Sequence, residues 1–456
     1  MTAPRNFLIL KYLNPGWYFN LLPEKSDSFP ACYFNSEFQN IPDDQKHLVK
    51  EDSRYRSRTA RELDMGFQAW NRGILLEARG VKAGELVHRE EIDVADEYIF
   101  IRKFYKSHRV YYFLIKNILS FRNPVKELRA FSETSGIKKE DLIHPHAVYP
   151  GYDEFDSKLL DENPKVSVII PTLNRYEYLK DAMADLAHQD YRNFEVIVVD
   201  QTDKPDKEFY TGIPLDMKVI FQEGKGQWLA RNEAIRNSSG ELYLFFDDDS
   251  RVDSDWITHH IKGIDYFDAD ISAGVSISTV GDKVPENYSF FRWADQFDSG
   301  NAMVRKRVFK KVGLFDRQFD RQRMGDGEFG LRAYLSGFRS ISHPFAKRIH
   351  LKIGTGGLRQ MGSWDAFRPK KFFSPRPLPS VLYLYRKYFP AGFVANAMLI
   401  GMLPSLIPYK WKGKKFLYPL SAIAACLIFP VLLMQLWISW RRSGRMLEEG
   451  DKIDRL

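Results

Sequence analysis

Short apolar runs alternate with helical patterns between residues 165 and 350, and this alternation limits the possible folds more than any other feature. Four runs rich in β-branched and aromatic residues predict buried strands: VSVII at 166–170, FEVIVVD at 194–200, MKVIF at 217–221 and LYLFFD at 242–247. Between them apolar residues recur at helical spacing, as at 178–186 and 229–235. The pattern predicts an α/β fold with a mostly parallel sheet flanked by helices, whose binding site lies at the carboxyl ends of the strands.

The 456 residues exceed one ordinary domain, and composition divides them into three regions. A polar linker at 161–164 precedes the first predicted strand, which gives an N-terminal accessory region at 1–160, an α/β domain at 161–375 and a C-terminal region at 376–456. Within the mainly helical first region, residues 97–121 interleave aromatic and basic side chains. This stretch is either a membrane-surface face or, as we favour, a helix packed on the α/β domain with its basic residues outward.

Two apolar runs, 389–409 and 416–440, carry no ionisable acid or base apart from Tyr and Cys, and a basic loop at 410–415 separates them. The second run is long enough to cross a bilayer, whereas Pro404 and Pro408 interrupt the first. A two-span hairpin would put the basic loop on the far side, against the positive-inside tendency. We therefore expect a half-inserted or interfacial first segment and a second that is re-entrant or spans once. Two core helices of a soluble domain are the alternative.

The net charge of +8, from 67 Lys and Arg against 59 Asp and Glu, suits anionic partners without choosing among nucleic acid, phospholipid headgroups and nucleotide phosphates. Because the positive charge is scattered, we expect no nucleic-acid partner. Two cysteines provide no disulfide framework and favour a reducing compartment. The apolar run at the N-terminus is too short for a signal peptide.

Asp247, Asp248 and Asp249 directly follow the strand LYLFF. Three adjacent carboxylates repel one another unless a cation compensates them, and oxygen ligands on a short loop suit Mg²⁺ or Mn²⁺. The sequence therefore predicts a divalent metal site here, with a solvated acidic loop or helix cap as the alternative.

Three weaker signals lie after other strands. Pro171-Thr172-Leu173-Asn174-Arg175 follows the first strand and Asp200 ends the second, where they can face phosphate, ribose or base, although helix capping explains the first group nearly as well. The run 224–232 begins a predicted helix with glycines and places Lys225 and Arg231 near the same edge of the sheet. A helix start favours an anion, and a plain glycine-rich turn is the alternative. Dinucleotide and P-loop motifs are missing from the sequence.

Taken in order, these segments resemble glycosyltransferase family 2, the inverting enzymes with the GT-A fold. The resemblance lies in VSVIIPTLNR, IVVD, the glycine-rich segment with Ala230-Arg231-Asn232, and LFFDDD, followed by SGNAMVR at 299–305, VGLFD at 312–316 and GDGEFGLR at 325–332. It implies transfer of a sugar, with inversion, from a nucleoside-diphosphate sugar to an acceptor hydroxyl. The domain at 161–375 would then be a GT-A catalytic domain.

The resemblance also implies roles by position. Thr172, Arg175 and Asp200 would contact the nucleoside, Asp247 and Asp248 the ribose and phosphates, Asp249 the metal, and Asp326 would be the catalytic base, with Gly325 in place of the family's Glu. Departures at 201–203 leave the base preference open. His350 lies where many relatives place a metal or diphosphate contact, so we expect it to be a second metal ligand, with an ordinary half-buried histidine as the alternative.

The remaining predicted substrate-binding residues lie in or beside the same motifs: Pro171, Asn174, Lys225, Trp228, Arg231, Asn232, Glu328 and Lys352. Of these, Lys225, Arg231 and Lys352 would assist the departing diphosphate. The glycines at 354, 356 and 357 with Arg359 would form a lid.

The expected partners are a nucleoside-diphosphate sugar, Mn²⁺ or Mg²⁺, a glycan or lipid-linked acceptor, and a membrane whose cytoplasmic face is met through the C-terminal apolar segments. Surface glycan or glycolipid synthesis would be the setting. Two rival functions stay open: a nucleotidyltransferase, which also uses carboxylates at strand ends, and a membrane-tethered nucleotide-sugar binding protein whose site is inactive because Gly325 replaces the Glu.

Overall fold

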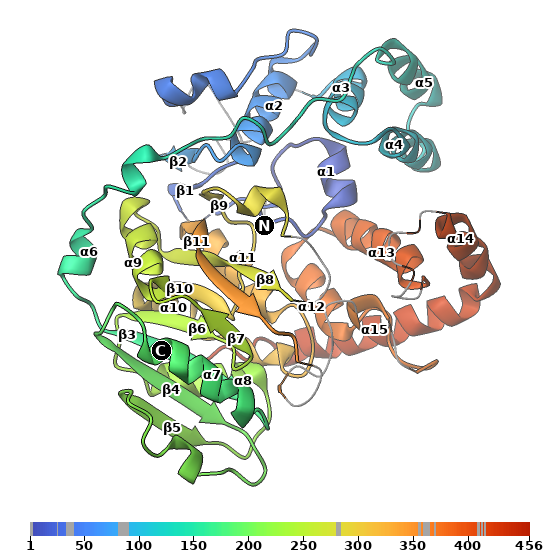
Figure 1. Ribbon diagram of the computed structural model, residues 1–456. Helices are drawn as coiled ribbons and strands as arrows, with labels where there is room; N and C mark the ends of the chain where they lie inside the picture. The colour runs from blue at the N-terminus through green and yellow to red at the C-terminus, as the bar shows by residue number, and fades with distance from the viewer. Residues whose placement is uncertain are drawn as a thin grey trace.

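The computed structural model describes residues 3–24, 26–32, 41–80, 91–279, 284–353, 357–358, 365–368, 371–407, 411, 414 and 416–456 (Figure 1). A mixed sheet forms its centre, with helices on both faces. The predicted α/β class is confirmed.

The central sheet has nine strands among the described residues, in the order β5-β4-β3-β6-β10-β8-β11-β7, with β9 paired to β11. The strands are β3 (Val166–Thr172), β4 (Phe194–Asp200), β5 (Met217–Phe221), β6 (Leu242–Phe246), β7 (Ser250–Val252), β8 (Ile271–Ser278), β9 (Arg292–Trp293), β10 (Asn301–Arg305) and β11 (Ser340–His350). The four predicted strands, β3 to β6, are parallel. The antiparallel strand β10 then separates them from the parallel pair β8 and β11, so the whole sheet is mixed.

Alternate side chains of β3 enter two different cores, as the two-residue period of a strand requires. Val166, Val168 and Ile170 pack with residues of α7 (Tyr176–Ala187) and α9 (Trp256–Tyr266). Ile169 joins a second core with residues of α8 (Gln227–Arg236), α10 (Lys306–Val312) and α11 (Gly325–Leu335). Both faces of the parallel part are therefore buried, which explains its uninterrupted apolar runs.

The N-terminal region shares that second core. Its elements are α1 (Leu8–Leu13), β1 (Ser28–Pro30), α2 (Arg58–Asn71), β2 (Glu77–Arg79), α3 (Val94–Phe104), α4 (Ser107–Leu119), α5 (Pro124–Glu133) and α6 (Lys158–Asp161), with β1 and β2 antiparallel. The stretch 97–121, expected as one helix, is divided between α3 and α4 at residues 105–106. α3 is largely buried, whereas α4 exposes several apolar side chains.

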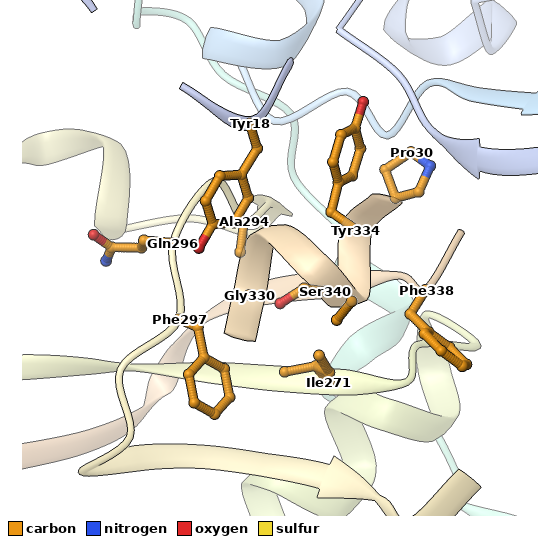
Figure 2. Close-up of a pocket in the computed structure, with 11 residues that line it drawn as sticks. Tyr18, Pro30, Ile271, Ala294, Gln296, Phe297, Gly330, Tyr334, Phe338 and Ser340 are labelled. Carbon is orange, nitrogen blue, oxygen red and sulfur yellow. The ribbon is translucent and has the colours of Figure 1, made fainter. Parts of the chain in front are cut away.

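Tyrosines dock this region onto α11. The Tyr18 hydroxyl donates to the Gly327 carbonyl at 3.0 Å, and the Tyr334 hydroxyl donates to the Leu21 carbonyl at 3.1 Å. A Cβ on Gly330 would lie 2.4 Å from the Tyr18 hydroxyl oxygen, so the close approach depends on glycine. Figure 2 shows the cavity at this junction, about 10 Å³ in volume and therefore no larger than one water molecule. The N-terminal region thus supports the helix that begins beside Asp326.

The C-terminal region forms α12 (Pro379–Tyr388), α13 (Ala391–Ser405), α14 (Leu417–Leu427) and α15 (Phe429–Glu449). The second apolar run is divided at Ile428, just before Pro430 in the first turn of α15, and the two helices meet at 81°. Within the described part of the chain, no single helix has the length and apolarity of a membrane span, although this bent pair meets both together.

The last residues return to the α/β domain. The Leu314 N–H donates to the Asp454 carbonyl at 2.8 Å, and the Gln318 side chain donates to the carbonyls of Met446 and Gly450 at 3.1 and 3.0 Å. The C-terminal helices are therefore anchored to the domain at their far end.

Candidate active site

Strands β3, β4 and β6 end at one edge of the sheet. Thr172 pairs with Asp200 across β3 and β4, and Asp247 follows the last residue of β6. The three segments that the sequence singled out separately are thus brought together.

Asp248 lies against the end of β3. It accepts hydrogen bonds from the Thr172 hydroxyl at 2.8 Å and from the Arg175 guanidinium at 3.1 Å. Burial raises the pKa of Asp248 to about 7, and the opposing effect of Arg175 is too small to prevent this.

Asp247 is held by two arginines from opposite sides. Arg231, fully buried on α8, donates to one carboxylate oxygen at 2.8 Å, and Arg348 on β11 donates to the other at 2.7 Å. Arg348 also binds both oxygens of Asp298, at 3.1 and 3.0 Å. Burial alone would raise the pKa of Asp298, but the charge of Arg348 and the hydrogen bonds from Ser276 and the Gly300 N–H together outweigh it, and the pKa is lowered.

These contacts change the argument for a metal. Three adjacent carboxylates need compensating positive charge, and in the structure Arg175, Arg231 and Arg348 supply it without a bound cation. Repulsion among the aspartates is therefore no longer evidence for a metal.

A different observation supports one. Asp247, Asp249 and His350 each offer a ligand atom, and these atoms lie within 4.8 Å of one another. His350 ends β11, and its Nε2 is 3.3 Å from an Asp249 oxygen. Burial would raise the pKa of Asp249, yet His350 and Arg175 outweigh burial and the pKa is lowered. Two carboxylates and one imidazole form a donor set that fits a divalent ion, and the nitrogen ligand suits Mn²⁺ better than Mg²⁺.

Asp200 ends β4 in a ring of donors. Its Oδ2 accepts from the hydroxyls of Tyr176 at 2.6 Å and Tyr210 at 2.9 Å, and its Oδ1 accepts from the Thr202 N–H at 2.9 Å. An ionised carboxylate has about four lone-pair sites, so acceptor capacity remains for a ligand.

Two further predicted residues lie beside this group. Asn174 is exposed, in a left-handed conformation (φ 55°), and its N–H donates to the Thr202 hydroxyl at 3.0 Å. Pro171 is buried within β3 and places Thr172 at the edge of the sheet.

The start of α8 differs from the expectation. Its N–H groups were expected to face a ligand anion, but the Asp320 carboxylate accepts from the N–H groups of Trp228 at 2.9 Å and Leu229 at 3.4 Å. Gly226 makes room for it, because a Cβ there would lie 2.6 Å from an Asp320 oxygen. The protein thus supplies the anion itself. Lys225 pairs with Asp203 at 2.5 Å.

Asp326 lies in the first turn of α11 and lines a cavity of about 120 Å³. The other lining residues are Gln227, Trp228, Phe319, Arg321, Gln322, Arg323, Met324, Gly327 and Leu358. One Asp326 oxygen accepts from the Ser299 N–H at 3.3 Å, while the Ser299 carbonyl accepts from Arg231 at 2.7 Å. A single residue and a single arginine therefore connect Asp326 to Asp247.

Trp228 fills the space beside Gly325. A Cβ on Gly325 would lie 2.3 Å from Cε2 of the buried indole. The position where the family has Glu therefore has no room for a side chain while Trp228 keeps this place. Trp228 still contributes to the wall of the cavity.

Three predicted binding residues are engaged within the protein. Arg231 is fully buried and positions Asp247, and the Asn232 side chain both donates to and accepts from the backbone of Phe315, at 2.8 and 2.9 Å. The Glu328 carboxylate is buried against Arg332 and Tyr388, at 3.0 and 2.5 Å. We therefore assign these residues to positioning the site, and leave them out of the proposed substrate contacts.

The segment after β11 folds back over the site. The Leu351 N–H donates to the Asp249 backbone carbonyl at 2.9 Å, and the Ile353 N–H donates to the Asp249 carboxylate at 3.3 Å. The exposed Lys352 lies between these two residues. The Gly357 N–H donates to the Leu173 carbonyl at 2.7 Å, and a Cβ on Gly357 would lie 2.4 Å from the Arg175 guanidinium carbon. The other lid residues named above, 354, 356 and 359, lie outside the described residues.

Sequence reasoning missed Arg348, Tyr176, Tyr210, Ser299 and Asp320. One signal was available for Arg348, because it lies two residues before His350 on a strand and so shares its face. Asp320 has no local signal, since it reaches α8 from about ninety positions away.

Part of this chain is similar in sequence to known glycosyltransferases. Residues of this chain are 28% identical over 170 residues to the glycosyltransferase GlyA of Streptococcus pneumoniae, covering 35% of this chain and 22% of that protein. They are 30% identical over 169 residues to the glycosyltransferase AglE of Haloferax volcanii, and this match covers 34% of this chain and 53% of AglE. The chain thus spans about a fifth and about half of these relatives. The matched part is a glycosyltransferase domain.

The family follows from a model of glycosyl transferase family 2, which matches residues 167–317. The matched residues of this chain are therefore similar to family 2 glycosyltransferases, and the resemblance predicted from the motifs is confirmed for that segment.

Among solved structures, one similar chain is the mannosyltransferase PcManGT of Pyrobaculum calidifontis in complex with GDP-Man and Mn²⁺. It is 17% identical with a TM-score of 0.40, and the match covers 62% of this chain and 86% of PcManGT. TarS 1–349 of S. aureus in complex with UDP-GlcNAc has 20% identity and a TM-score of 0.37, covering 63% and 92%.

Proposed function

We propose that this protein transfers a sugar from a nucleoside-diphosphate sugar to an acceptor hydroxyl with inversion at the anomeric carbon. The observation that carries the proposal is the link Asp326, Ser299, Arg231, Asp247, which brings a carboxylate in a cavity next to the acidic strand end. A base on one side and a cation-binding group on the other are what a single displacement requires.

Asp326 is the general base in this proposal. A sugar hydroxyl is a weak nucleophile at neutral pH, so its proton must pass to a positioned acceptor as attack proceeds, and such bases contribute about 10² to 10⁴-fold. The cavity of about 120 Å³ gives the acceptor a place against Asp326. The Ser299 N–H fixes the orientation of the carboxylate.

Asp247, Asp249 and His350 would hold the divalent ion. When bound, such an ion supplies Lewis-acid stabilisation of the charge that builds up on the leaving diphosphate. Lys352, exposed between two residues that bind Asp249, adds positive charge on the same side.

Thr172, Arg175 and Asp200 would hold the nucleoside, together with Tyr176 and Tyr210, which sequence reasoning missed. A nucleotide must share the oxygens of Asp200 with three donors that already bind it. Base selectivity would depend on whether a tyrosine hydroxyl is displaced.

We further propose that the protein works at the cytoplasmic face of a membrane, on a glycan or lipid-linked acceptor. Exposed apolar side chains on α14 and α15, among them Leu420, Leu427 and Trp437, support association through the C-terminal helices. Arg441, Arg442 and Arg445, in the last part of α15 beyond the apolar run, favour the cytoplasmic face.

A donor screen tests the proposed activity. Nucleoside-diphosphate sugars are incubated with the protein, with and without Mn²⁺, and thermal protection and nucleoside diphosphate release are measured. We expect one donor class to protect in Mn²⁺ and to release its nucleoside diphosphate. Pyrophosphate release from a nucleoside triphosphate would instead indicate a nucleotidyltransferase, and protection without release would indicate a binding protein with an inactive site.

A further inference from the structure

The N-terminal region exposes seven large apolar side chains within eighteen residues. They are Tyr111, Ile115, Ile118 and Leu119 on α4, Phe121 in the following turn, and Val125 and Leu128 on α5, and we call them the N-terminal apolar patch. Phe121 is 98% exposed and Leu119 is 74% exposed. Single exposed apolar residues are ordinary, but a group of this size on two helices in contact and on the turn between them marks an interaction surface.

The patch is separate from the face by which α4 packs on the protein. Val110, Phe113 and Asn117 are buried, and Asn117 donates to Glu127 at 3.0 Å within the helical cluster. The exposed residues 111, 115, 118 and 119 follow helical spacing on another face. α4 is therefore apolar on two faces, and the described fold accounts for only one of them.

The exposed charges along the patch are positive. Residues 106–126 contain Lys106, Arg109, Lys116, Arg122 and Lys126 and no Asp or Glu, and Glu127, the one acid between Tyr111 and Leu128, is only 2% exposed. A helix that combines aromatic and aliphatic residues with Lys and Arg, without acids, has the composition of a segment lying in the interface of an anionic bilayer. A second copy of this chain would bring the same positive charge to the contact and be repelled by it.

The patch lies on the side of the C-terminal apolar helices. Lys116 on α4 donates to the Asn396 side chain on α13 at 2.5 Å, and Lys11 on α1 is 5.9 Å from the centre of the Phe393 ring. Figure 1 places α4 and α5 on the same side of the molecule as α13 and α14. Two regions nearly 300 positions apart in sequence thus present apolar surface in one direction.

We propose that the N-terminal apolar patch binds the surface of an anionic lipid bilayer, as a second contact beside the C-terminal helices. This inference rests on the membrane association of the proposed function and adds an element to it. Two separated contacts fix the orientation of a protein on a bilayer, which one contact cannot do. The acceptor cavity would then keep a constant height above the lipid headgroups.

Vesicle sedimentation of the full chain tests the proposal. Phosphatidylcholine vesicles with and without phosphatidylglycerol are compared for the native protein and for Leu119→Ser/Phe121→Ser, whose sites are exposed and outside the core. We expect the native protein to bind the anionic vesicles and the variant to bind them roughly tenfold or more weakly, because two large side chains no longer leave water. Val148→Ser, at an exposed site away from the patch, is the matched control and should bind as the native protein does.

Two further variants separate the possible failures. Leu420→Ser/Leu427→Ser removes exposed C-terminal side chains; if it alone weakens binding, the membrane association stands and the patch proposal is wrong. Arg122→Gln/Lys126→Gln should remove most of the preference for anionic vesicles, and an unchanged preference would contradict the charge argument. If the Leu119/Phe121 variant instead converts a dimer to a monomer in sizing without altering vesicle binding, the patch is a contact between copies and the proposal is overturned.

Discussion

Replacing Gly325 by alanine tests whether Trp228 excludes a side chain from the position where the family has Glu. In a helix, Gly→Ala ordinarily stabilises by about 0.4–1 kcal/mol, because it restricts the unfolded chain. Here the new Cβ would lie 2.3 Å from the Trp228 ring. The indole is fixed by its N–H bond to the Phe319 carbonyl at 3.2 Å and by Phe315, with ring centroids 4.9 Å apart. Overpacking costs about 1–3 kcal/mol, so we expect a net loss of about 1–2 kcal/mol in unfolding free energy.

A mutant cycle followed by urea unfolding and far-ultraviolet circular dichroism isolates the contact. Trp228→Leu alone should cost about 3 kcal/mol, through lost burial and a cavity. In the Trp228→Leu background, Gly325→Ala should cost nothing or stabilise. Gly327→Ala is the matched control, since its Cβ would meet only Met324, at 3.9 Å, and it should be neutral or stabilising. If Gly325→Ala is as stable as Gly327→Ala, the steric explanation is refuted.

Three other perturbations give distinct results. His350→Ala should weaken Mn²⁺ binding in calorimetry at least roughly tenfold relative to the exposed control His188→Ala, and equal affinities would contradict the proposed ligand set. Glu328→Gln leaves the buried Arg332 without its anion, so the free energy of unfolding should fall by about 3 kcal/mol; an unchanged urea midpoint would refute this. Burial raises the pKa of Glu97 from 4.5 to about 8. Because the folded state then holds the proton more tightly than the unfolded state, the free energy of unfolding should decrease as the pH rises from about 4.5 to about 8, and then level off. Glu97→Gln should flatten this dependence in unfolding at pH 5.5 and 8.5, and an unaltered slope would count against it.

The strands that carry the site could be predicted because they are local and strongly patterned. β3 and β6 are buried on both faces, so their apolar runs need no knowledge of their partners. The acidic residues after β6 could be located for the same reason.

What compensates those acids could not be predicted. Arg348 reaches Asp247 from a strand about a hundred positions later, and no local pattern records that pairing. The partner of the α8 start could not be predicted for the same reason. A glycine-rich helix start has the same local sequence whether the anion that it binds is a ligand or the distant Asp320.

Helix faces were the other limit of the sequence analysis. Periodicity identified a helical stretch at 97–121 but not which side would pack, and α4 exposes apolar side chains as well as basic ones. In the second apolar run, composition indicated a length sufficient to cross a bilayer, whereas Pro430 divides it into two helices.

The central claim is that Asp326 takes a proton from the acceptor while the separate acidic cluster holds the donor. The most direct measurement compares donor binding and sugar transfer in Asp326→Asn and in Asp216→Asn, an exposed control directly before β5. We predict that Asp326→Asn binds the nucleotide sugar with native affinity and loses transfer by at least about a hundredfold, while the control keeps both. Native transfer rates in Asp326→Asn would contradict the account.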